Sequence, residues 1–144
     1  MQAAIALVRG GKLDMPSLGL KGRPRSVTGR VKLLCDGRYR NRGPMARGEL
    51  NHMGATAVLD TGKVEIVVIS NHVEPHDLAA FQAVGIDPAG KRYLMLKSRV
   101  HWRAGLKSLA GAVVECAGSG VCTSDYAALN FKHVRRPIYP LDPL

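Results

Sequence analysis

The chain has 144 residues, a length typical of one domain that can bury a core. Hydrophobic residues make up 46% of it, which excludes a disordered tail, and no apolar run reaches the roughly 18 residues of a membrane span. The formal net charge is +10, and basic residues are concentrated between Lys21 and Arg47. This basic segment could bind nucleic acid or another anionic ligand, or it could be a solvated surface. Because no recognition helix or stacking aromatic pattern accompanies it, we do not expect nucleic acid as the partner.

The N-terminal third combines a loop, a strand and a second irregular segment. Residues 10–24 are rich in glycine, proline and lysine and predict a loop. Residues 26–35 begin with alternating polarity and become apolar, which predicts a strand. Asp36-Gly37 is a turn signal, and the polar segment 38–47 with its Gly-Pro pair predicts an irregular segment.

The middle of the chain predicts a hairpin followed by a helix. Two β-branched runs, 55–60 and 64–70, flank a short glycine turn, and the second run is apolar enough for a central strand. Asp77 is a good N-cap for a helix over 78–84, and Gly85 is a good stop signal. These patterns place helices beside strands in one unit.

The last third predicts a buried strand over 92–97, a helix to about Ala110 and a short strand over 112–116. The proline-rich tail is irregular, and its apolar residues should pack onto the body. We therefore predict a single α/β domain, or an α+β domain, over residues 1–144, with a mixed β-sheet and a few packed helices. The odd number of cysteines (Cys35, Cys116, Cys122) and the absence of a targeting pattern predict buried, reduced thiols and a cytoplasmic protein.

Polar side chains gather where the predicted strand 92–97 meets its helix. They are Lys97, Ser98, His101 and Arg103. Ligands in open α/β sheets bind at the carboxyl ends of strands, so these four residues are candidates for a substrate cleft. Ser98 could be an activated nucleophile or a helix N-cap, and the two roles are compatible. His101 could face the same ligand or bond the backbone, and Arg103 could clamp a substrate carboxylate or pair with an acidic residue of another domain.

A second candidate is the loop that begins with Asn41 and Arg42, because the following Gly-Pro pair fixes a turn and holds both residues at its edge. The alternative is a purely structural loop. Among the five histidines, only His72 and His76 have helical i,i+4 spacing, and Pro75 lies between them. Proline breaks the helix that such a metal motif requires, so we expect no metal ligand in this chain.

Several segments of the chain, taken together in order and spacing, form one recognisable pattern from about residue 10 to the end. They are Gly29 to Leu34, Asp36 to Arg38, Asn41 to Met45, Gly54 to Leu59, Val67 to Ser70, Glu74 to Asp77, Phe81, Gly85 to Pro88, Lys97 to Arg103 and Arg135 to Asp142. This pattern resembles the C-terminal domain of the microcystinase C (MlrC) family of zinc peptidases. Two positions depart from the family pattern: Glu74 stands where a glutamine is expected, and His76 where an aromatic or apolar residue is expected.

The resemblance implies a role within a larger enzyme. In the family, a preceding N-terminal domain carries the zinc and most catalytic groups, and metal-bound water attacks an amide carbonyl. We therefore expect this chain to lack the zinc site, to be inactive alone, and to shape the substrate cleft beside that domain. The expected substrate is a small peptide or amide. A stand-alone basic binding module is the alternative, and exposed core faces would make a homo-oligomer possible.

Overall fold

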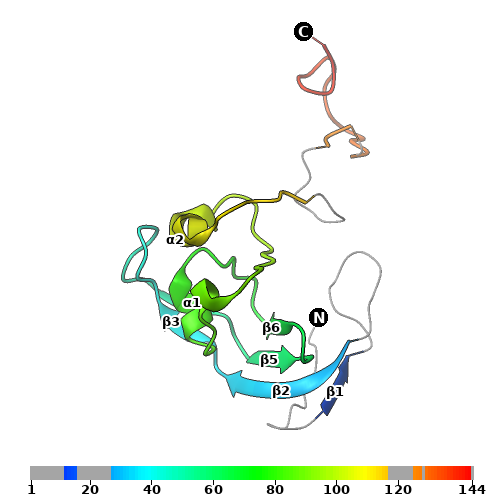
Figure 1. Ribbon diagram of the computed structural model, residues 1–144. Coiled ribbons are helices and arrows are strands. Elements are labelled where there is room, and N and C mark those ends of the chain that lie inside the picture. The colour runs from blue at the N-terminus through cyan, green and yellow to red at the C-terminus, as the bar shows by residue number, and fades with distance from the viewer. Residues whose placement is uncertain (1–11, 16–26, 117–124, 128, 144) are drawn as a thin grey trace.

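The computed structural model describes residues 12–15, 27–116, 125–127 and 129–143 (Figure 1). Its main sheet has four strands in the order β1-β2-β5-β6, and every adjacent pair is antiparallel. A two-stranded antiparallel sheet, β3-β4, lies beside it. The strands are β1 (Lys12–Met15), β2 (Val27–Cys35), β3 (Arg38–Arg40), β4 (Leu50–His52), β5 (Thr56–Asp60) and β6 (Glu65–Ile69).

The predicted single domain of strands and a few packed helices is confirmed, and its antiparallel pairing is the α+β form of that prediction. The β5–β6 hairpin is also confirmed, and it is closed by a hydrogen bond of 3.0 Å from Thr61 N–H to the Val64 carbonyl. Two details were wrong. Strand β3 lies in the segment predicted to be irregular, and β6 is an edge strand of the main sheet. The apolar composition of β6 reflects burial rather than a central position. The strand is partly buried because Val67 and Ile69 pack against the core.

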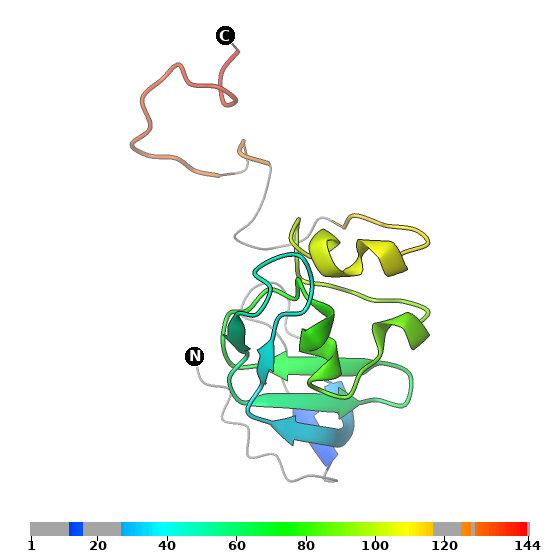
Figure 2. The same cartoon turned by 90° about the vertical axis from the view of Figure 1, so that its left-hand side faces the viewer.

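The core lies between the sheets and helix α1 (Leu78–Gln82), which covers one face of the main sheet (Figures 1 and 2). Val58 of the inner strand β5 is completely buried, and Ala79 and Ala80 bring α1 close to it. Small residues on the buried face of a helix allow close packing on a pleated sheet. The core also takes Tyr39, Met53, Val84 and Ile86.

Local signals at both ends of α1 act as predicted. Asp77 is the N-cap, and its carboxylate accepts a hydrogen bond of 2.8 Å from the Ala79 N–H. Gly85 has φ of +72°, the left-handed conformation that ends a helix and that glycine adopts without strain. The chain then forms a 3-10 turn over Pro88–Gly90, capped by Asp87.

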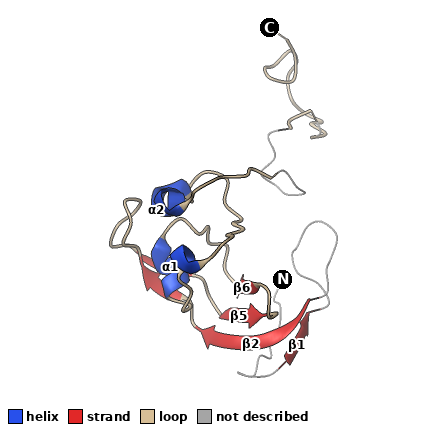
Figure 3. Cartoon of the chain, in the orientation of Figure 1, coloured by secondary structure: helices blue, strands red, loops and turns tan. Residues whose placement is uncertain are grey.

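The predicted strands over 92–97 and 112–116 are wrong. Both segments run without ladder partners, and Tyr93, Met95 and Val114 are 81%, 100% and 83% exposed. The helix between them is present as α2 (Arg103–Leu106), followed by a 3-10 turn over Lys107–Leu109. Figure 3 shows α1 and α2 on the same side of the sheet, with α2 farther from it. Cys116 is exposed rather than buried, Cys35 is partly buried, and Cys122 lies outside the described residues.

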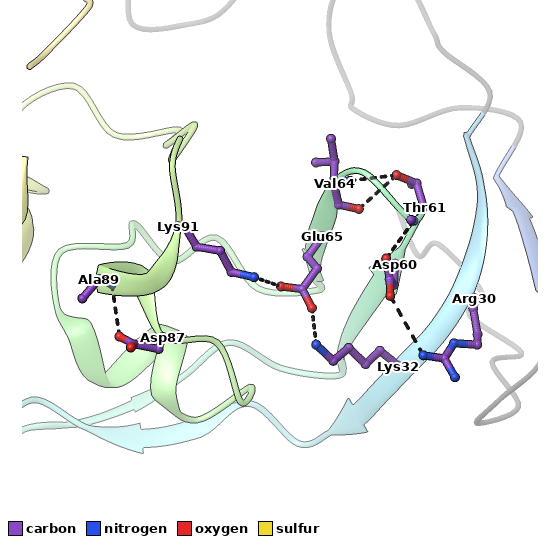
Figure 4. A network of polar contacts seen from close by, with 10 residues as sticks. Arg30, Lys32, Asp60, Thr61, Val64, Glu65, Asp87, Ala89 and Lys91 are labelled. Atoms are coloured by element: carbon purple, nitrogen blue, oxygen red, sulfur yellow. Dashed lines mark hydrogen bonds and ion pairs between the residues drawn. The ribbon is translucent and has the colours of Figure 1, made fainter.

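A charged cluster ties the turn after α1 to the sheet (Figure 4). The Glu65 carboxylate pairs with Lys32 of β2 and with Lys91, which follows the 3-10 turn. The hydrogen bond from Lys32, followed by that from Lys91, lowers the pKa of Glu65 below its ordinary value. The Glu65 side chain is largely buried, whereas the two lysine side chains are more exposed. Because one carboxylate binds both lysines, these ion pairs hold the edge strand β6 to β2 and to the turn after α1.

The tail from residue 129 to 143 lies away from the body in both views (Figures 1 and 2), so the prediction that it packs onto the body is wrong. Tyr139 is 71% exposed, and Phe131 and Ile138 are also exposed. The tail instead bonds to itself: Arg136 pairs with Asp142, whose carboxylate also accepts a hydrogen bond of 2.8 Å from the Ile138 N–H. Within the described residues, no helix is long and apolar enough to cross a membrane.

Candidate functional site

The segment Glu74 to Asp77, which we call the 74–77 turn, joins the two predicted groups of candidate residues. It follows β6 and leads directly into α1. Glu74 contacts Ser98 and His101, whereas His76 and Asp77 contact the loop that begins at Asn41. These partners are separated by 24 to 35 positions along the chain, so only the folded structure brings them together.

Glu74 collects three donors from the segment before α2. Its Oε1 accepts hydrogen bonds from the Ser98 hydroxyl and, at 3.2 Å, from the Arg99 N–H. Its Oε2 lies 2.6 Å from Nδ1 of His101. Burial is the largest single influence and alone would raise the pKa of Glu74. The hydrogen bonds from Ser98 and His101 together outweigh burial, and the net effect lowers the pKa. Glu74 is therefore a carboxylate at neutral pH.

The contacts of Ser98 correct one of the two roles considered for it. The hydroxyl donates to Glu74, and its oxygen accepts a hydrogen bond of 3.0 Å from the Trp102 N–H just before α2. The predicted N-cap role is wrong, because the N-cap of α2 is Trp102, which has no side-chain cap hydrogen bond. Ser98 instead stabilises the turn that leads into α2, and its role as a nucleophile stays a prediction.

His101 is held by one ring nitrogen. Nδ1 carries the proton that bonds Glu74, because a carboxylate is only an acceptor. The side chain is 54% exposed, and Nε2 has no hydrogen bond to any described residue. A carboxylate that holds one ring nitrogen fixes the tautomer and the orientation of the imidazole. His101 therefore presents an oriented ring nitrogen, Nε2, at the surface.

The remaining two residues of this segment lie outside the Glu74 contacts. Lys97 is exposed. The guanidinium of Arg103 stacks on the Trp102 ring at 5.0 Å, donates to the Arg99 carbonyl at 3.0 Å and pairs with Glu115. The sequence suggested an acidic residue of another domain as one alternative partner for Arg103, whereas the structure pairs it with Glu115 of this chain.

Asn41 belongs to the interior of the second group. It is 2% exposed, and its Nδ2 donates to the Ala46 carbonyl at 3.2 Å and lies 3.2 Å from Nε2 of His76. Nδ1 of His76 lies 3.0 Å from the Glu74 carbonyl. Both ring nitrogens of His76 thus lie within hydrogen-bond distance of a partner, one on its own turn and one on the loop. Asn41 is therefore a structural residue that connects its loop to the 74–77 turn.

Asp77 holds the same loop against α1. Besides capping the helix, its carboxylate accepts hydrogen bonds from the N–H groups of Arg42 at 3.0 Å and Gly43 at 2.7 Å. The residue is only 1% exposed. Gly105 allows α2 to pack against the 74–77 turn, because a Cβ at this position would lie 2.5 Å from the His76 carbonyl oxygen. The loop, α1 and α2 thus meet at the 74–77 turn.

The described residues do not fit a zinc site. They contain no group of three or more His, Cys, Asp or Glu side chains that could hold a metal ion. His76 already uses both ring nitrogens, and His101 uses one of them on Glu74. Protein zinc sites need three or four ligands, and the described side chains do not bring that number together.

The described part of the basic segment is partly neutralised. Arg38 lies 3.4 Å from Asp36, Arg30 lies 4.0 Å from Asp60, and Lys32 pairs with Glu65. Fewer free cations remain for phosphate groups than the sequence count indicates. Nucleic-acid binding stays an alternative prediction without a structural feature that favours it.

The central position of Glu74 and His76 was not predicted from the sequence. Glu74 stood out only as a departure from a family pattern, and His76 as such a departure and as half of an unsuitable metal-ligand pair. One signal was available. Glu74 is an isolated carboxylate in a basic chain, three residues ahead of a strong N-cap. Isolated carboxylates that are partly buried generally have partners.

The chain is similar to known proteins over nearly its whole length. A family model described as MlrC C-terminus matches residues 1–133. Microcystinase C from Sphingomonas sp. is 27% identical over 143 residues, which are 99% of this chain and 26% of that protein. The crystal structure of a protein named as a candidate metallopeptidase, from Mesorhizobium sp. BNC1, has the same fold, with a TM-score of 0.82 at 24% identity over 95% of this chain and 28% of that chain. The chain therefore spans about a quarter of the length of these relatives, and it belongs to the MlrC C-terminus family.

Proposed function

We propose that this chain is the C-terminal domain of a metal-dependent peptidase or amide hydrolase and forms one wall of its substrate cleft. Membership of the MlrC family and similarity to a microcystinase support the reaction class. The single observation that carries the site is His101, oriented by Glu74 with Nε2 exposed. The other wall and the zinc would come from a larger catalytic domain, and the substrate would be a small peptide or amide.

The residues of this wall have distinct proposed roles. His101 touches the substrate and accepts or donates a proton at Nε2, whereas Glu74 positions it. Arg103 and Lys97 contribute positive charge near the same edge. Ser98 maintains the local backbone. The buried Asn41 holds its loop to the 74–77 turn, and the exposed Arg42 of that loop forms the neighbouring edge of the cleft.

Exposed apolar side chains support a large partner surface. Tyr93, Met95 and Val114 are strongly exposed and belong to the segments that flank α2. Contiguous exposed apolar residues generally mark an interaction site. We propose that the catalytic domain covers them, and that self-association occurs where it does not. A cytoplasmic location remains part of this proposal, because the cysteines described are free.

A chimaera tests the role of His101. This chain would replace the matching quarter of the Sphingomonas microcystinase C, and hydrolysis of a small peptide would be followed by mass spectrometry. General acid–base groups contribute about 10²–10⁴ to the rate, so His101→Gln should lower kcat/KM by about 10² or more. His52→Gln, which changes an exposed histidine of β4, is the matched control and should leave kcat/KM unchanged.

The kcat and KM of a Glu74 variant separate the proposed role from a structural one. Glu74→Gln should lower kcat with little change in KM, because the imidazole of His101 loses the carboxylate that orients it. Equal kcat/KM for His101→Gln and His52→Gln in a folded chimaera would refute the proposed role of His101. Stoichiometric zinc together with turnover by this chain alone would refute its expected dependence on another domain.

A further inference from the structure

A pocket of about 310 Å³ lies between the loop that begins at Asn41, which lines it from Arg42 onward, and the helices α1 and α2. This volume is at the low end of the range for small-molecule sites. Pro44 and Leu78 provide apolar walls, whereas Gly43 and Gly105 contribute backbone without side chains. The pocket is thus built from three elements that the 74–77 turn holds together.

The polar side chains that line the pocket include one cation and two neutral donors. Arg42 is its only basic residue, and Gln82 and Ser108 are neutral groups that can donate hydrogen bonds. The structure gives the Arg42 guanidinium no hydrogen bond or ion pair to a described residue, although its backbone N–H is bound by Asp77. The pocket therefore presents an unused planar cation beside neutral donors.

Asp77, the single acidic residue in the lining, does not cancel this charge effectively. Its side chain is almost fully buried, and its two oxygens accept three backbone N–H groups, from Arg42, Gly43 and Ala79. Those donors stabilise the negative charge and occupy the lone pairs that a cationic ligand would need. A cationic ligand would therefore find few free lone pairs on Asp77, whereas the Arg42 guanidinium, which has no partner among the described residues, can still bind an anion.

We propose that this pocket binds the carboxylate of a small ligand, with Arg42 as a two-pronged donor and Gln82 and Ser108 as neutral partners. The guanidinium fork matches a carboxylate in plane and spacing, and the apolar walls suit a short side chain next to it. The carboxylate site stands on the geometry of the pocket. Its assignment to the free C-terminus of a short peptide rests on the proposed hydrolase function.

Two probes that differ in one group test the proposal. N-acetyl-alanyl-alanine carries a free carboxylate, and the same peptide with a C-terminal amide does not. Titration of the ¹⁵N-labelled chain should shift the amide signals of Gly43 and Gly105 with the acid but not with the amide. A charge-assisted bidentate contact is worth enough for Arg42→Gln to weaken binding by about tenfold or more. Arg42→Lys should retain part of the affinity.

Arg47→Gln is the matched control, because Arg47 is an exposed arginine of the same loop outside the pocket lining. It should bind the acid as the unchanged chain does. Equal affinities for acid and amide, or equal losses in Arg42→Gln and Arg47→Gln, would overturn the proposal. The titration requires no hydrolysis, so absent binding leaves the role of His101 untouched, and an inactive chimaera leaves the carboxylate site untouched.

Discussion

The buried carboxylate of Asp77 gives a sharp prediction about stability. Asp77→Ala removes the acceptor for the N–H groups of Arg42, Gly43 and Ala79. An unsatisfied buried donor costs ~1–3 kcal/mol, and three such donors with partial relaxation give ~3–6 kcal/mol. Domains of this size are stable by ~5–15 kcal/mol. The variant should therefore be strongly destabilised, while its free energy of unfolding should still be large enough to measure.

The chain contains a matched control in Asp87. Its carboxylate also accepts the N–H two residues ahead, from Ala89 at 3.1 Å, but Asp87 is exposed and holds no second element. Losing such a cap typically costs ~1 kcal/mol. The free energy of unfolding, measured by urea titration with circular dichroism, should fall by ~2–5 kcal/mol more for Asp77→Ala than for Asp87→Ala.

If Asp77→Ala does not fold, Asp77→Asn provides the measurement, because its carbonyl oxygen keeps part of the acceptor capacity. A loss for Asp77→Ala no greater than that for Asp87→Ala would refute the reasoning. It would mean that the loop beginning at Asn41 is held by contacts other than the Asp77 carboxylate.

Two further predictions concern the same region. Gly105→Ala should destabilise the fold by ~1–3 kcal/mol, although alanine normally favours a helix, because its Cβ would meet the His76 carbonyl oxygen at 2.5 Å. Gly111→Ala, where no atom lies within 4 Å, is the control in the same urea titration, and equal effects would contradict the close contact. Glu74 has a pKa below its ordinary value of 4.5, so its contribution to stability is present above the unfolded pKa and is lost as the pH falls through the folded pKa. The unfolding midpoint of Glu74→Gln should therefore change less than that of the unchanged chain between about pH 6 and pH 3, and parallel curves would exclude this contribution.

Local signals predicted the parts of the fold that local chemistry determines. The β5–β6 turn, the Asp77 cap and the Gly85 stop each depend on residues within four positions. The position of β6 at the edge depends on which strands pair, and that is decided by distant segments. The run 92–97 has the composition of a strand, yet β-propensity expresses a fit to a half-buried surface. No strand of the described residues pairs with this run to provide one.

The candidate site residues also divide into those that local sequence predicts and those that only the tertiary structure reveals. Ser98 and His101 were predicted from their clustering, and the structure brings both to one carboxylate. Their partner Glu74 lies 24 and 27 positions away, and hydrogen bonds over such separations leave no periodic trace in a sequence. Asn41 was identified as part of a fixed loop, but its contact with His76 likewise depends on tertiary structure.

The 74–77 turn also determines how changes in this domain would combine. One four-residue segment carries the partners of His101 at one end and those of Asn41 and Arg42 at the other. Substitutions that share a backbone segment usually have non-additive effects. The tolerance of one group to mutation should therefore depend on which residues occupy the other, and during sequence divergence the two groups are expected to change together.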